Sequence, residues 1–182
     1  NVALYKQADV DNFVASYRNC EVINGNLSSG GVVTDFSKLT SLKRIEGSFK
    51  IEYSKISDVS NFYNLEYVGG DFLIRGTQIK NLVGFNNLKT VNGSFIMYEN
   101  YLNETINGFE KLETINGDLQ FYEASLRTII GFEKLIEIGN NLRITDNFNL
   151  TQIPEFNSLK IIGADLRITN DYQSALEHIN EV

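Results

Sequence analysis

The sequence predicts an all-β protein: a right-handed parallel β-solenoid of about seven 23–24-residue coils with a short N-terminal capping helix. Three observations predict it. A set of apolar positions recurs every 23 or 24 residues, apolar and polar residues alternate in short runs, and glycine, often as Asn-Gly, separates these runs. Two-helix repeats need about 33 residues or more. Because period-2 alternation is typical of strands, each repeat is predicted to be one β coil.

Each repeat carries the same series of apolar positions. The segment GFEKLETINGDLQF at 108–121 returns as GFEKLIEIGNNLRI at 131–144. The first apolar column is Leu39, Phe62, Phe85, Phe109, Phe132 and Phe156, and Leu follows three residues later at Leu42, Leu65, Leu88, Leu112, Leu135 and Leu159. One coil cannot bury such side chains alone, so we expect the columns to stack into a continuous core.

A glycine separates the two apolar runs of a coil. It occurs at Gly47, Gly70, Gly93 and Gly117, and short alternating runs such as Phe72-x-Ile74 follow it. We expect a tight corner with positive φ at these glycines, since glycine adopts that conformation readily. Strands of successive coils would pair in parallel about 4.8 Å apart, which gives a rod about 30 Å long. Right-handed winding is expected for parallel crossovers.

The N-terminal residues predict a cover for the first coil. The segment QADVDNFVASY, 7–17, has its apolar residues at helical spacing, and Asp9 is the expected N-cap. The face expected to lie on the coil is Val10, Phe13, Val14 and Tyr17. We therefore assign 1–19 to an N-terminal capping helix and 20–182 to the solenoid, within a single domain overall.

The repeat resembles a known family. NCEVINGNL at 19–27, followed by copies of F-x-x-L-x-x-[IV]-x-G-x-[LF]-x-[IFM], resembles the receptor L-domain, a leucine-rich-repeat-like β-helix, over about residues 8–182. The resemblance implies a ligand-binding surface module, as in the L domains of growth-factor and insulin receptors. Receptor L domains carry disulfides at their ends, whereas this chain has only Cys20, so it looks nearest to secreted, lipid-anchored or cell-surface bacterial members.

Charge and composition limit the classes of partner that the chain can bind. The net charge is −7 and the isoelectric point about 4.8, with Lys and Arg scattered among acids. A nucleic-acid backbone or anionic membrane would require clustered basic residues, so neither is the expected partner. No apolar run approaches the length of a membrane span, and we expect no direct membrane insertion. With the resemblance, this favours an extracellular or cell-surface location, including lipid anchoring outside a bacterium.

The outward positions of the strand after the glycine indicate a candidate binding face. Leu73, Ile96, Tyr98 and Tyr122 would be neighbours there, where polar residues are the rule. Exposed apolar clusters often mark contact surfaces, and Tyr combines area with a hydroxyl. The predicted ligand-binding residues are Leu73, Arg75, Ile96, Tyr98, Tyr122 and Arg143. The alternative is that a loop covers the cluster or that it only stabilises the sheet by cross-strand packing.

No residue pattern indicates catalysis. Asp71, Asp118 and Asp165 share one column, but Asp after a corner commonly accepts hydrogen bonds from turn amides. The only histidine, His178, is far along the rod from Cys20, and no metal-ligand spacing occurs. We expect no cofactor, no metal and no enzyme activity.

Three functions remain at this point. The first is a non-catalytic cell-surface or secreted recognition module that binds a protein or glycan through an exposed parallel sheet. The second is a structural spacer, wall component or adhesin part without a specific small ligand. The third is a carbohydrate-active β-helix enzyme, which the nearly uniform coil length disfavours because it leaves little chain for a cleft.

Overall fold

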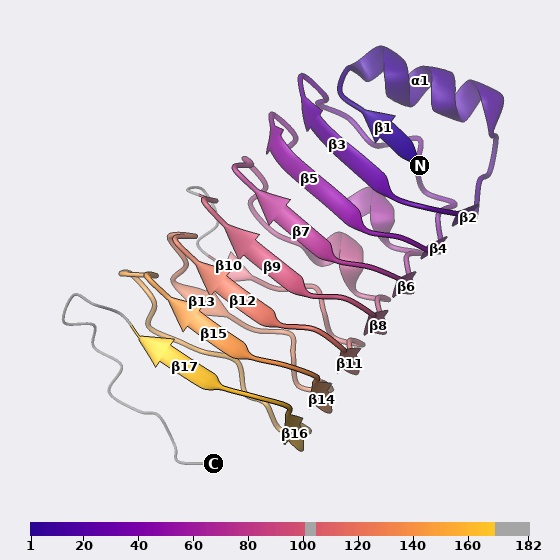
Figure 1. Cartoon of the computed structure of the whole chain (residues 1–182). Coiled ribbons are helices and arrows are strands. Elements are labelled where there is room, and N and C mark those ends of the chain that lie inside the picture. Colours follow the sequence, from indigo (N-terminus) through magenta and orange to yellow (C-terminus); the bar gives the residue numbers. More distant parts are fainter. Residues whose placement is uncertain (101–104, 170–182) are drawn as a thin grey trace.

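A computed structural model describes residues 1–100 and 105–169. It forms a β-solenoid rod with one long strand on the same side of each coil (Figure 1). The long strands form an eight-stranded sheet in the order β1-β3-β5-β7-β9-β12-β15-β17, and every pairing is parallel. Their bounds are β1 (Val2–Leu4), β3 (Leu27–Gly31), β5 (Phe49–Ser54), β7 (Phe72–Arg75), β9 (Phe95–Tyr98), β12 (Leu119–Tyr122), β15 (Leu142–Thr145) and β17 (Leu166–Thr169).

A second parallel sheet consists of two-residue strands that precede the glycine of each coil. Its strands are β2 (Val22–Ile23), β4 (Arg44–Ile45), β6 (Tyr67–Val68), β8 (Thr90–Val91), β11 (Thr114–Ile115), β14 (Glu137–Ile138) and β16 (Ile161–Ile162). A third sheet pairs β10 (Thr105–Ile106) with β13 (Thr128–Ile129), and two 3-10 turns, η1 (Ser60–Phe62) and η2 (Val83–Phe85), precede the Leu column. The predicted all-β solenoid of about seven coils is therefore confirmed, whereas its right-handed winding stays a prediction.

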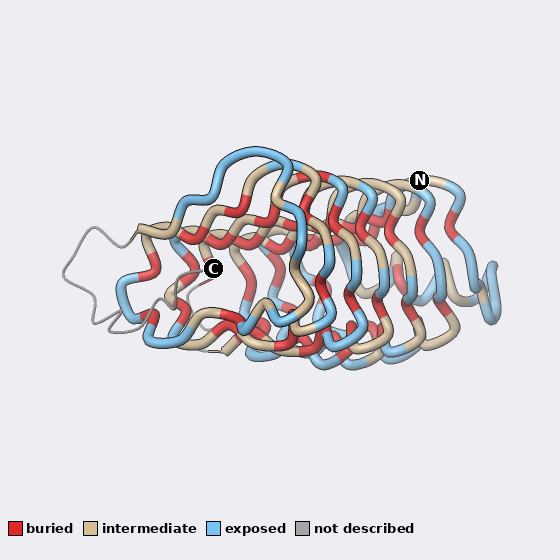
Figure 2. Tube along the Cα trace, turned by 90° about the horizontal axis from the view of Figure 1, so that it is seen from below, coloured by how far each residue is buried: buried red, intermediate tan, exposed pale blue. Residues whose placement is uncertain are grey.

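The core lies inside the coils as continuous columns. Phe62, Phe85, Phe109 and Phe132 are fully buried, and buried residues recur at the same place in successive coils (Figure 2). Within the column rings stack, as for Phe62 and Phe85 with centroids 5.6 Å apart and planes 9° apart. A second phenylalanine column meets it edge-on, with Phe72 and Phe85 centroids 4.9 Å apart at 89°. Edge-to-face and offset contacts between rings add stability beyond buried area.

The N-terminal end of the rod holds a strand as well as a helix. Helix α1 (Gln7–Ser16) lies beside β1 at this end (Figure 1). Val10 is fully buried, and Phe13 and Val14 pack partly buried against the core. Tyr17 was expected on the same face but is 62% exposed, because it is the C-cap of the helix rather than part of it.

Two local predictions at this end were wrong. The N-cap is Lys6 rather than Asp9. Asp9 lies in the first turn, where its Oδ2 accepts hydrogen bonds from the backbone N–H groups of Tyr5 and Lys6, both at 2.9 Å. Strand β1 was missed because residues 1–19 were assigned to the helix. The signal was present, since the pair Asn1-Val2 takes the register of Asn26-Leu27 one coil later.

The glycine corners also differ from the prediction. Gly47, Gly70, Gly93 and Gly117 do not have positive φ; of the corner column only Gly25 does. These glycines are needed for space, because a Cβ on Gly93 would lie 2.5 Å from Oδ1 of Asp71 and 2.7 Å from the carbonyl carbon of Gly70. Asn140 and Ala164 take the same position in later coils without positive φ.

Positive φ occurs at a second corner, at the end of the long strands. The residues there are Tyr53, Gly76, Glu99, Glu123 and Asp146, with φ between 48° and 60°. The next residue is buried, and twice it is an asparagine that fastens the turn. Asn100 Oδ1 accepts from the backbone N–H of Thr77 at 3.1 Å, and its Nδ2 donates to the carbonyl of Ile74 at 2.9 Å. We call these positions the left-handed corner.

Candidate functional site

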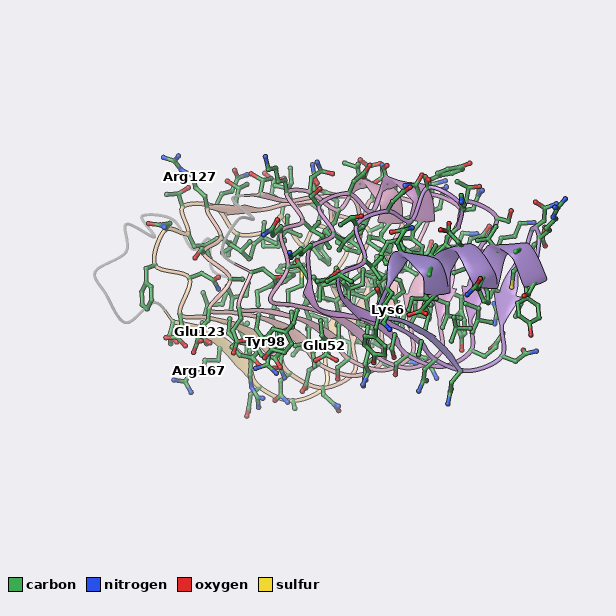
Figure 3. The ribbon with its side chains drawn as sticks, turned by 90° about the horizontal axis from the view of Figure 1, so that it is seen from above. Lys6, Glu52, Tyr98, Glu123, Arg127 and Arg167 are labelled. Atoms are coloured by element: carbon green, nitrogen blue, oxygen red, sulfur yellow. The ribbon has the colours of Figure 1, made fainter. Side chains whose placement is uncertain are left out.

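The candidate site is the outward face of the long sheet. Leu73 lies opposite Ile96, and Tyr98 lies opposite both Arg75 and Tyr122. All of these side chains are half-buried, so no described segment covers them fully. Figure 3 shows Tyr98 on the same side of the rod as Glu52, Glu123 and Arg167, with Arg127 on the opposite side. Five of the six predicted binding residues thus form one contiguous patch, which we call the tyrosine patch: Leu73, Arg75, Ile96, Tyr98 and Tyr122.

The two tyrosines of the patch stack face to face. The centroids of Tyr98 and Tyr122 are 4.7 Å apart and their planes differ by 13°. This distance equals the spacing of neighbouring strands, so the two rings stack along the rod axis and each covers one face of the other. Burial raises the pKa of the Tyr98 phenol, and burial likewise raises the pKa of Tyr122. Like an ordinary phenol, each hydroxyl is neutral at neutral pH and can donate a hydrogen bond.

Arg75 is engaged within the chain. Its Nε donates to Oε2 of Glu99 at 3.0 Å, and its Nη2 donates to Oε1 at 3.1 Å. The guanidinium carbon also lies 4.4 Å from the ring centroid of Tyr98 and 4.7 Å from that of Tyr53. The bidentate bond raises the pKa of Arg75 and lowers the pKa of Glu99. Arg75 is thus an ordered spacer between two tyrosines, and its charge is matched by Glu99.

Tyr53, Glu99 and Gly76 were not among the predicted site residues. Tyr53 is 57% exposed, and its hydroxyl donates to Oε2 of Glu99 at 3.4 Å, two coils away. Gly76 makes this possible, since a Cβ there would lie 2.7 Å from Cδ1 of Tyr53. All three belong to the left-handed corner, which no recurring residue type marks in the sequence. One feature of the sequence could have indicated this corner: Gly76 stands where the other coils have a larger residue.

Arg143 lies at the margin of the patch. It is half-buried and stands opposite Gln120 on the neighbouring strand. It has no carboxylate within 4.0 Å in the part of the chain that the structure describes. Its positive charge makes a minor contribution to the lowered pKa of Asp118. The positive charge of Arg143 is therefore available at one end of the patch, unlike that of Arg75.

The aspartate column serves the fold. The side chain after the first corner accepts a hydrogen bond from the backbone N–H of its counterpart in the next coil. This series, which we call the acceptor ladder, runs through Asn1, Asn26, Ser48, Asp71, Ser94, Asp118, Asn141 and Asp165. The predicted use of these side chains by turn amides is confirmed for Asp71 and Asp118, whereas Asp165 takes part through its backbone N–H.

Asp118 is the rung with the most partners. It accepts from the backbone N–H of Asn141 at 2.9 Å, from the side chain of Asn141 at 2.8 Å and from Gln120 Nε2 at 2.7 Å. Burial raises the pKa of this carboxyl, but the bonds from Asn141 and Gln120 outweigh burial, so the pKa lies below its ordinary value. An ionised acceptor in a filled hydrogen-bond site is poorly suited to act as an acid or base.

No metal-binding group stands out in residues 1–100 and 105–169: no three His, Cys, Asp or Glu side chains converge there. Cys20 is half-buried, and its thiol donates to the carbonyl of Val22 at 3.4 Å. His178 lies outside the described residues. Over the same described ranges, the helices are too short and too polar to span a bilayer.

The outward face of the short sheet is mixed, with charged side chains and separate apolar ones. Two ion pairs join neighbouring coils there: Lys43 Nζ lies 2.9 Å from Oε1 of Glu21, and Lys89 Nζ lies 2.8 Å from Oε2 of Glu66. These ions are about half exposed, so each pair adds little stability. Val22 and Ile161 are exposed at opposite ends of the short sheet, and the ring of Tyr67 lies under Arg44, so the apolar and aromatic side chains of this face do not gather as those of the tyrosine patch do.

The comparisons with known proteins agree with the repeat. Residues 19–79, about a third of the chain, match the family model described as the receptor L domain. The searches of curated proteins and of solved structures gave no significant match. The resemblance predicted from the sequence is confirmed for this segment, which contains Tyr53 and Arg75. Beyond it, parallel coil pairing continues to β17.

Proposed function

We propose that this chain is a non-catalytic, extracellular or cell-surface recognition module that binds a protein or glycan through the tyrosine patch. The match of residues 19–79 to the receptor L domain supports a receptor-like ligand-binding role. The observation that carries the proposal is the half-buried group of Leu73, Ile96, Tyr98 and Tyr122 on a regular sheet, where the other outward positions are polar.

The geometry of the patch suits recognition for a physical reason. Its tyrosines are held by each other and by Arg75, and Arg75 is fixed by two hydrogen bonds to Glu99. Side chains that are ordered before association lose little further entropy when a partner binds. A flat face of ordered tyrosine edges and two aliphatic side chains therefore provides contact area at a low entropic cost.

The test is binding by the purified chain to a glycan array and to a library of surface proteins, compared with Tyr98→Ala/Tyr122→Ala. We expect a specific ligand that the double variant loses, since both changes remove contact area at the centre of the patch. Tyr63→Ala is the matched control, because Tyr63 is 48% exposed at the end of η1, away from the long sheet.

The stability of the double variant must be measured alongside. Removing the stacked pair should lower the free energy of unfolding by about 1 kcal/mol, which leaves the rod folded. Ligand binding that survives in Tyr98→Ala/Tyr122→Ala would show that the patch is not the site. Binding lost equally in Tyr63→Ala would point to a general effect on the protein instead.

One observation favours the structural alternative. The polar groups of the patch satisfy each other: Arg75, Glu99 and Tyr53 are joined within the chain, and the tyrosines stack. Cross-strand packing of this kind stabilises a sheet with no ligand present. A spacer or wall component would therefore show no saturable ligand in the array and library and would tolerate Tyr98→Ala/Tyr122→Ala in its biological setting.

A further inference from the structure

The orientation of the rings limits which ligands the patch can take. Sugars are usually held by aromatic rings whose faces are open, whereas one face each of Tyr98 and Tyr122 is used in their own stack. The other face of Tyr98 is occupied by the guanidinium of Arg75, 4.4 Å from the ring centroid. Tyr98, at the centre of the patch, therefore offers its ring edge and hydroxyl, which complement side chains of a protein better than the flat face of a sugar ring.

Charge is distributed unevenly around these edges. The left-handed corner places Glu99, Glu123 and Asp146 in successive coils directly after Tyr98, Tyr122 and Thr145. Glu99 is neutralised by Arg75, but Glu123 and Asp146 have no cationic side chain within 4.0 Å in the described part of the chain. Figure 3 shows Glu123 on the same side of the rod as Tyr98 and Glu52.

These observations define the partner by its chemistry. We infer that the tyrosine patch binds a protein segment that presents an apolar or aromatic anchor with Arg or Lys beside it. The anchor would lie on Leu73, Ile96 and the tyrosine edges, and the cations would face Glu123 and Asp146. This inference rests on the proposed function, and it selects a protein partner from the two ligand classes named there.

An anionic ligand is disfavoured at this position. Arg75, whose guanidinium lies over Tyr98, already donates two of its N–H groups to Glu99, and the net charge of the chain is −7. Arg143 is unpaired among the described residues, but it lies at the margin of the patch, opposite Gln120. A cationic partner gains from the same field, since opposite charges steer association and fix the register of the complex. Exposed ion pairs of this kind contribute modestly, so the anchor supplies affinity and the acids supply selectivity.

The test is selection from a random 12-residue peptide library displayed on phage, with the purified 182-residue chain as bait. Three baits run in parallel: the wild-type chain, Glu123→Gln/Asp146→Asn, and the control Glu113→Gln/Glu137→Gln. The control removes two carboxylates next to or within the short sheet, at β11 and β14. Oligosaccharides on an array serve as the second class of probe.

We expect peptides selected by the wild-type chain to be rich in Arg or Lys adjacent to Leu, Phe, Tyr or Trp. Synthetic copies should lose affinity by about fivefold for each ion pair removed in Glu123→Gln/Asp146→Asn. They should bind the Glu113→Gln/Glu137→Gln control like the wild type. Association should slow as salt rises from about 0.05 M to 0.5 M, because salt screens exposed charges.

Two other outcomes would count against the inference, and one of them would also count against the proposed function. Peptides that depend on Tyr98 and Tyr122 but show no basic preference, or oligosaccharides that depend on them instead, would overturn the inference and leave the proposed function standing. Failure to obtain any peptide or oligosaccharide that depends on Tyr98 and Tyr122 would count against both.

Discussion

The two corners of a coil solve the same problem in opposite ways. The first corner excludes side chains for lack of space: Gly70, Gly93 and Gly117 each lie against the coil before. The left-handed corner demands an unusual backbone but, except at Gly76, has room for a side chain, and it carries Tyr53, Glu99, Glu123 and Asp146. The first corner fastens coil to coil through the acceptor ladder, and the second displays side chains beside the tyrosine patch. The residue type thus differs from coil to coil at the second corner, beside the tyrosine patch, whereas glycine recurs at the first.

The largest effect should come from filling the first corner. Gly93→Ala places a Cβ against backbone of the preceding coil that cannot move without separating the strands. We expect a loss of about 2–3 kcal/mol in the free energy of unfolding, measured by urea denaturation. The control is Asn140→Ala, at the same position of a later coil where a side chain is already accommodated, with a change within about 0.5 kcal/mol. Equal effects for both would contradict a steric role for Gly93.

A smaller, pH-dependent effect is expected at Asp118 in the acceptor ladder. Its pKa is lowered in the folded chain by the bonds from Asn141 and Gln120, so its carboxylate stabilises the fold above the ordinary pKa of about 4. This contribution is lost as pH falls through the lowered folded pKa. Asp118→Asn should therefore be less stable than wild type at pH 7, by less than about 1 kcal/mol, with the gap closing in strong acid. Thermal melts across this pH range measure it, and a constant gap would show that ionisation is irrelevant.

The smallest effect should be a gain at the left-handed corner. Glu123 has φ of 48°, a conformation that strains a residue with a side chain. Glu123→Gly removes the strain but adds freedom to the unfolded chain, so we expect a net increase of about 0.5 kcal/mol. The change is read from the denaturation midpoint. The companion variant Gly76→Ala should instead be destabilised, because its Cβ would meet the ring of Tyr53. A Glu123→Gly variant less stable than wild type would assign the carboxylate an intramolecular role.

The apolar columns could be predicted from the sequence because the same residue types recur in them. The left-handed corner could not, because only its backbone conformation recurs. Columns such as Phe62, Phe85 and Phe109 have one residue type in one register, so periodicity alone identifies them as core. The left-handed corner holds tyrosine, glycine, glutamate and aspartate, which share no property except φ. Positive φ was consequently expected at the glycines that recur from coil to coil, where the actual constraint is the distance to the neighbouring coil.

The candidate site was predictable to the same extent. Alternation placed Leu73, Ile96, Tyr98 and Tyr122 together on one face, because strand register follows directly from the repeat. The partners of Arg75 were not predictable, since Glu99 and Tyr53 point back over the sheet from a corner whose conformation no residue type announces. A sequence pattern specifies which face a side chain occupies, whereas the direction of a turn decides which neighbours it meets.

The acceptor ladder gives the rod a direction. Each rung offers an oxygen to the backbone N–H of the coil that follows it in the chain, from Asn1 to Asn26 and on to Asp165. The ribosome makes coils in that same order. A newly synthesised coil therefore meets a surface on which its hydrogen-bond acceptor is already in place, and the rod can lengthen one coil at a time from the N-terminal end while translation continues.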